Sequence, residues 1–156
     1  MVFETDLELM FPNNYINSST ERLKLYTQLN KICELDELNS FKLELTDRFG
    51  ALPNVVVELL NSLELRWLAA ALGFDKIVLK KNILISYMMN FNSDEQKKKL
   101  DKLFDYSNLN PNSISFSQKR LADGDRFIVK IKNIDSVKNA KRAISPSALF
   151  DSMTIE

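Results

Sequence analysis

The most specific grouping of charged side chains lies between residues 43 and 48. Glu44, Asp47 and Arg48 are spaced i, i+3 and i+4, which places them on one face if the segment is helical. They then border the apolar stripe of that helix, whereas Leu43 points away from the stripe. A Glu–Arg pair at this spacing contributes only about 0.2–0.5 kcal/mol by itself. We interpret the four residues together as a candidate charged docking surface.

Other reactive residue types occur in contexts that favour structural roles. The carboxylate pairs Asp36–Glu37 and Asp123–Asp125 suit a helix terminus and a turn, because acid–base catalysis needs two carboxyls in a cleft with shifted pKa values. The Asp-Gly-Asp turn also lacks the terminal glutamate of an EF-hand loop. The single cysteine, Cys33, is predicted to be buried on the apolar face of a first helix. We therefore expect no catalytic centre.

The residues that the sequence lacks exclude several classes of enzyme. It has no histidine, which excludes an imidazole base and most zinc sites. Its three glycines, Gly50, Gly73 and Gly124, are too far apart to form a phosphate-binding loop or a dinucleotide fingerprint. We expect no cofactor and no bound metal.

Charge is distributed unevenly along a chain of zero net charge. Residues 1–60 contain ten acids and five bases, whereas residues 76–132 contain twelve bases and six acids, with Lys97, Lys98 and Lys99 adjacent. An acidic half suits a basic partner, and a basic half suits phosphates. A nucleic-acid-binding module that uses residues 76–132 is therefore the main alternative function, although a merely solvated face also explains these charges.

The periodicity of apolar residues predicts the elements that must position these groups. Ser18 and Glu21 match a capping box that opens a helix to about Cys33, and a second helix covers 36–49 with Gly50 as its stop. A third begins near Pro53 and ends at Gly73, with Trp67 on its buried face. A hairpin at 76–88 turns at Lys80–Asn82, and a charged helix at 93–106 opens with a possible Ser93/Gln96 capping box. A second strand pair covers 113–117 and 127–131, and a last helix runs from Asp135 to Ile144 before Pro146.

This order predicts an α+β fold, an antiparallel sheet of short strands covered by about five helices. The length of 156 residues suits one domain. We expect an extended N-terminal arm over 1–17, broken by Pro12 and lying on the surface of the core, one α+β domain over 18–146, and a loosely ordered tail over 147–156. An acidic N-terminus and the absence of a long apolar run favour a cytoplasmic protein.

The ordered run LELTDRFGALP, residues 43–53, resembles the signature of the C-terminal domain of bacterial transcription-repair coupling factors, the Mfd family. The resemblance continues through FPNNYI and ERLKLY upstream, and through Leu65-Arg66 and Leu72-Gly73 downstream. It covers about residues 8–75. Beyond that segment the similarity is one of length and pattern.

The resemblance implies a regulatory, non-catalytic role. In that family the intact protein is an ATP-driven DNA translocase that removes stalled RNA polymerase and recruits the repair protein UvrA. Its C-terminal domain packs against a UvrB-like module of the same chain and hides the UvrA-binding surface until polymerase is engaged. The family's interdomain contact matches Glu44, Asp47 and Arg48 here.

The partners that the resemblance implies are thus the UvrB-like module directly, and UvrA and RNA polymerase indirectly. A membrane partner is not expected, and neither is direct nucleic-acid binding by this domain. A small enzyme of another class is the least supported reading, because histidine and glycine-rich loops are missing.

Overall fold

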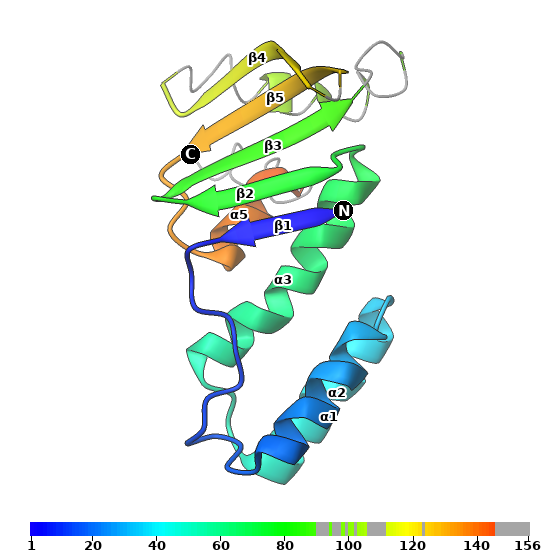
Figure 1. Ribbon diagram of the computed structural model, residues 1–156, viewed down its shortest axis with the longest axis vertical. Helices are drawn as coiled ribbons and strands as arrows, with labels where there is room; N and C mark the ends of the chain where they lie inside the picture. The colour runs from blue at the N-terminus through cyan, green and yellow to red at the C-terminus, as the bar shows by residue number, and fades with distance from the viewer. Residues whose placement is uncertain are drawn as a thin grey trace. The chain divides into compact units, whose positions relative to one another are not determined.

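The computed structural model describes residues 1–89, 94, 98, 100, 101, 103–105, 112–122 and 124–145. Its helices are α1 (Ser19–Asn30), α2 (Leu35–Phe49), α3 (Asn54–Ala71) and α5 (Val137–Ile144), and the described residues between 94 and 105 are also helical. Its strands are β1 (Val2–Thr5), β2 (Lys76–Lys80), β3 (Ile83–Met89), β4 (Ile114–Leu121) and β5 (Gly124–Lys132), as Figure 1 shows. The predicted α+β class is confirmed.

The chain forms two compact units. The helical unit is Glu8–Asn61, and the sheet unit combines Met1–Leu7 with the chain from Ser62 onward. α3 therefore begins in the helical unit and ends in the sheet unit. The predicted boundaries of an arm over 1–17, a domain over 18–146 and a tail over 147–156 stay predictions, since the tail lies outside the described residues.

The sheet has five strands in the order β1-β2-β3-β5-β4. Both predicted hairpins are present, with β2 antiparallel to β3 and β4 antiparallel to β5. The first turns through Lys81 and Asn82, whose φ angles of 53° and 62° are the left-handed values that a tight two-residue hairpin turn requires. β1 was not predicted. It pairs in parallel with β2, with Val2 opposite Lys76 and Thr5 opposite Leu79.

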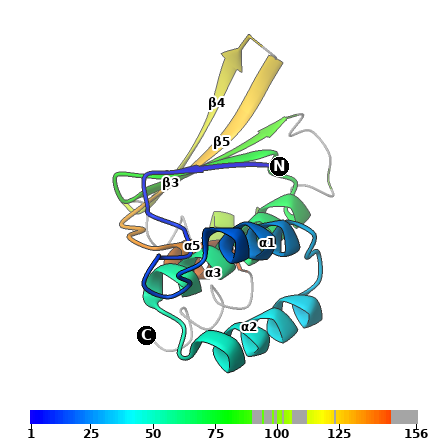
Figure 2. The same ribbon diagram turned by 60° about the horizontal axis from the view of Figure 1, so that its bottom comes forward.

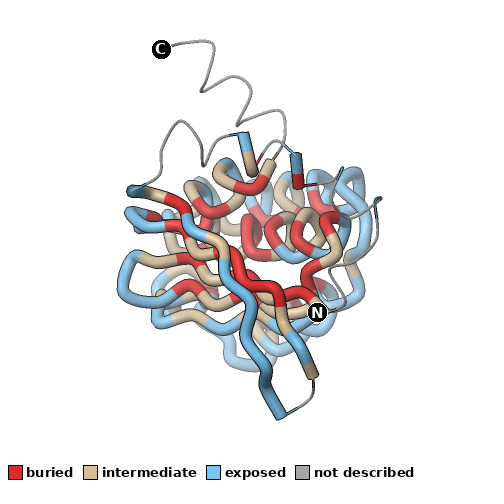
Figure 3. Tube along the Cα trace, turned by 90° about the horizontal axis from the view of Figure 1, so that it is seen from above, coloured by how far each residue is buried: buried red, intermediate tan, exposed pale blue. Residues whose placement is uncertain are grey.

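One face of this sheet is the core of its unit. Buried and half-buried residues alternate along β2 and β3, and Figure 3 colours the described residues of the chain by burial. The buried positions include Ile77, Leu84 and Val129, which the strand register aligns with their neighbours. Within the sheet unit, α5 and the part of α3 from Ser62 onward lie on one side of the strands (Figure 2). The predicted α5 stripe of Val137, Ala140 and Ile144 is buried.

The helical unit is held together by the segment that precedes α1. Phe11 is 2% exposed and Ile16 is 1% exposed, so this segment belongs to the core and not to its surface as predicted. The Phe11 ring lies 4.7 Å from that of Tyr26, whose hydroxyl accepts a hydrogen bond from the Phe11 amide at 2.7 Å. The Tyr15 hydroxyl reaches the carbonyl oxygen of Gly50 at 2.9 Å, beyond the end of α2. Pro12 thus marks a turn that folds apolar residues inward.

Two predictions about buried side chains are wrong. α1 ends at Asn30, because the amides of Lys31 and Ile32 bond to carbonyls only three residues back, and this tighter turn leaves Cys33 exposed. On α3, Leu65 and Ala69 are buried while Trp67 is only half-buried. The Ser93/Gln96 capping box, Asp123 and the predicted stop at Pro146 lie outside the described residues.

Candidate docking surface

α2 separates a buried stripe from an outward face. Leu38, Phe41 and Leu45 are at most 2% exposed, whereas Leu43 is 73% exposed, as its position in the helical period predicts. Asp47 lies one turn after Leu43 and is also exposed. The helix ends at Gly50, whose φ of 93° favours glycine. The outward face of α2 therefore presents an apolar side chain beside a carboxylate.

Glu44 and Arg48 lie at the side of α2 that meets α1. The Arg48 guanidinium donates to the Glu21 carboxylate and lies 3.5 Å from a Glu44 oxygen. The Gln28 amide donates to the other Glu44 oxygen at 3.1 Å. Glu21 raises the pKa of the Arg48 guanidinium further above its ordinary value, so the arginine stays charged. These contacts join α1 to α2.

The four predicted surface residues therefore fall into two pairs. Glu44 and Arg48 are engaged within the helical unit, while Leu43 and Asp47 make no hydrogen bond or ion pair with any side chain among the described residues. Sequence reasoning missed Glu21 and Gln28 as partners of this site. Glu21 also belongs to the predicted capping box at the start of α1. One of the two hydrogen bonds of that box is present, because the Glu21 amide donates to Ser18 Oγ at 3.2 Å.

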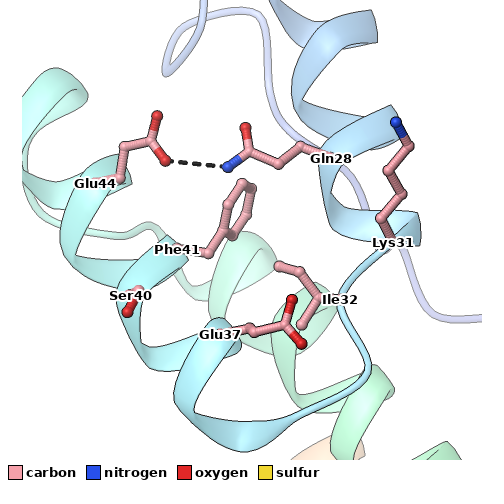
Figure 4. A pocket seen from close by; sticks show the side chains of 7 residues that line it. All are labelled: Gln28, Lys31, Ile32, Glu37, Ser40, Phe41 and Glu44. Atoms are coloured by element: carbon pink, nitrogen blue, oxygen red, sulfur yellow. Dashed lines mark hydrogen bonds between the residues drawn. The ribbon is translucent and has the colours of Figure 1, made fainter.

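A shallow pocket of about 350 Å³ lies beside this network, between α1 and α2 (Figure 4). Its walls carry Lys31, Glu37 and Glu44, with Phe41 and Ile32 between them. Nearby, the Cys33 thiol lies 3.7 Å from a Glu37 oxygen, and the negative charge of Glu37 raises the pKa of the thiol. Cys33 is exposed, yet its thiolate is disfavoured, so it is a poor nucleophile.

The basic segment is partly neutralised within the sheet unit. Lys76 and Lys80 lie 3.6 and 3.7 Å from Glu4 of β1, and Arg126 is paired with Asp75. Lys119, Lys130 and Lys132 have no acidic partner in the described part of the chain. Lys97 and Lys99 lie outside the described residues. The described residues hold no cluster of three or more potential metal ligands, and none of their helices is long and apolar enough to span a bilayer.

The fold and the outward face of α2 define a small α+β domain with a candidate docking surface. The chain belongs to the TRCF domain family, which matches residues 5–102. The resemblance inferred from residues 43–53 is therefore confirmed, and the match extends further along the chain than that inference did.

Curated relatives and a solved structure agree with this family. The chain is 27% identical over 147 residues to a transcription-repair-coupling factor of Borreliella burgdorferi, an alignment that covers 88% of this chain and 13% of that protein. It is 35% identical over 78 residues to that of Escherichia coli K12, covering 47% of this chain and 7% of that protein. The chain thus spans a small part of the length of these relatives.

The fold also matches the crystal structure of a C-terminal domain of transcription-repair coupling factor. The TM-score is 0.61 at 14% identity, over 99% of this chain and 96% of that one. At this identity the match concerns the fold alone.

Proposed function

We propose that this chain is a non-catalytic regulatory domain of a transcription-repair coupling factor. In this proposal it docks on the UvrB-like module of the same protein and masks UvrA binding until stalled RNA polymerase is engaged. The observation that carries the proposal is the TRCF family match over residues 5–102. The protein would act in transcription-coupled nucleotide excision repair in the bacterial cytoplasm.

The α2 surface, formed by Leu43, Glu44, Asp47 and Arg48, supports this proposal because two of these residues face outward and the other two contact α1. Leu43 and Asp47 supply the outward contact, an apolar anchor beside a carboxylate that suits an arginine on the partner. Glu44 and Arg48 border the same surface, and their contacts with Gln28 and Glu21 hold α2 against α1. Tethering within one polypeptide raises the effective concentration of the partner, so a weak contact suffices to keep the protein closed.

The test uses a full-length transcription-repair coupling factor that carries this domain. Leu43→Ser/Asp47→Lys removes the anchor and reverses the charge without touching the Glu44–Arg48 contacts. The matched control is Leu23→Ser/Glu8→Lys, because Leu23 is 68% exposed on α1 and Glu8 is exposed. We expect the first variant, and not the control, to capture UvrA in a pull-down without RNA polymerase. Circular dichroism of the isolated domain checks that both variants fold.

The same variants can be tested in trans. The isolated chain should bind a separate UvrB-like module weakly, and Leu43→Ser/Asp47→Lys should weaken that binding by about tenfold or more. UvrA capture and module binding that are both unchanged in a folded variant would refute the role of Leu43 and Asp47. The family assignment would stand.

A further inference from the structure

The sheet has a second face, opposite its core. The strand register aligns Lys76, Tyr87, Ile128 and Ser117 in one row across β2, β3, β5 and β4, and Val78, Ile85, Lys130 and Ser115 in the next. Val78, Ile85 and Tyr87 are half-buried, and Ile128 is 7% exposed. Among the described residues of the sheet unit, no helix lies on this side (Figure 2). We call this surface, formed by the two rows and their flanking lysines, the open face.

Cations surround the apolar middle of the open face. Lys130 and Lys132 are successive outward residues of β5, and Lys119 on β4 lies opposite Arg126. All three lysines have no acidic partner in the described part of the chain. The face also holds Lys76 and Lys80, which share the single carboxylate of Glu4 at 3.6 and 3.7 Å. The side of the sheet near β4 and β5 therefore carries positive charge that no described acidic residue of the unit pairs with.

This combination differs from an ordinary solvated face of a sheet. A sheet with one side in water usually carries polar residues at every outward position. Here apolar side chains occupy the outward rows on β2 and β3, while Lys130 and Lys132 lie on β5 and Lys119 lies on β4. An apolar patch bordered by polar side chains is a composition found at protein interfaces.

The aromatic content argues against a nucleic acid as the occupant. Binding of single strands relies on several exposed aromatic rings that stack on bases. In these two rows Tyr87 is the one aromatic side chain, and the Lys76 ammonium already lies 5.8 Å from the centre of its ring. Valine and isoleucine offer no flat surface for a base, but they pack well against leucine and isoleucine side chains.

We propose that the open face is a second interaction surface, for an acidic amphipathic segment of another protein. Apolar side chains of that segment cover Val78, Ile85 and Tyr87, and its carboxylates pair with Lys119, Lys130 and Lys132. The surface is built from the sheet unit alone. It is separate from the α2 surface, and the proposal does not depend on the docking role of Leu43 and Asp47.

The test titrates the ¹⁵N-labelled chain with a designed amphipathic helical peptide that has leucines on one face and glutamates on both flanks. Two further ligands are titrated for comparison. One is the same peptide with lysine in place of every glutamate, and the other is a single-stranded oligothymidine. The surface variant is Lys119→Glu/Lys130→Glu/Lys132→Glu. The control is Lys24→Glu/Lys138→Glu/Arg142→Glu, which changes net charge equally at exposed helical positions.

We expect changes in amide chemical shift that cluster on β2, β3 and β5. The Kd for the acidic peptide should rise by about tenfold in the surface variant and stay unchanged in the control variant. Absence of such shifts at about 1 mM acidic peptide would overturn the proposal. So would equal binding of the lysine peptide, or equal loss in the control variant. Oligothymidine binding that maps to this face without peptide binding would replace it with a nucleic-acid site.

Discussion

Leu43 and Leu45 lie two residues apart on α2 and have opposite surroundings. Leu45 is fully buried and Leu43 is 73% exposed. Leu45→Ala should lower the free energy of unfolding by about 2–5 kcal/mol, because a buried large-to-small change loses apolar burial and leaves a cavity. Leu43→Ala should cost less than about 1 kcal/mol. Urea denaturation followed by circular dichroism measures both, and equal losses would contradict this orientation of α2.

For individual side chains of α2, the sequence predicts which way each one faces, but not which other side chain it contacts. The period of α2 predicted Leu43 outward and Leu45 inward, since both depend only on neighbours in the same helix. The contacts of Glu44 with Gln28 and of Arg48 with Glu21 depend on how two helices pack, which periodicity does not specify. The helical period places Cys33 on the buried face only if the helix continues past Asn30, where the backbone instead tightens and the helix ends.

The start of α1 depends on one side chain. Ser18 Oγ accepts from the Glu21 amide, which is one of the first amides of a helix that have no partner inside it. Ser18→Ala should therefore destabilise the chain by about 1 kcal/mol. The neighbouring Ser19→Ala is the matched control and should be close to neutral, since Ser19 is already inside the helix. If thermal unfolding moves equally in both variants, the cap does not contribute as described.

Local signals were sufficient for most elements and failed for one strand. The hairpin of β2 and β3 was predictable because its turn residues adjoin both strands. β1 has four residues, lies at the edge of the sheet and pairs with residues about seventy positions later. Nothing within Val2–Thr5 indicates such a distant partner, so no local pattern could reveal this strand.

For the molecule as a whole, we expect the chain neither to bind nor to hydrolyse ATP. Its sequence has three widely spaced glycines and no phosphate-binding loop, and a nucleotide site of the common kind requires one. Equilibrium binding of a fluorescent ATP analogue should be indistinguishable from that of bovine serum albumin. Saturable binding, or phosphate release that a point change in this chain abolishes, would show the expectation to be wrong.

The fold class was predictable from the order of elements, whereas the division into two units was not. Helices followed by strand pairs indicate α+β, and the structure agrees. The boundary between the units falls inside α3, between Asn61 and Ser62, where no proline, glycine or change of composition marks it. Compactness depends on which contacts form between distant segments, and a linear pattern does not contain that information.

The pairing of β1 with β2 sets an order of events during synthesis. Residues 2–5 leave the ribosome before their partner strand, which begins at Lys76, so β1 waits while the whole helical unit is translated. The residues of the helical unit are contiguous, and their contacts close short loops, which favours early folding. The nascent chain should therefore hold a folded helical unit while β1 still lacks its partner strand. Pairing of β1 with β2 then joins, in one sheet, segments that precede and follow the helical unit in the sequence.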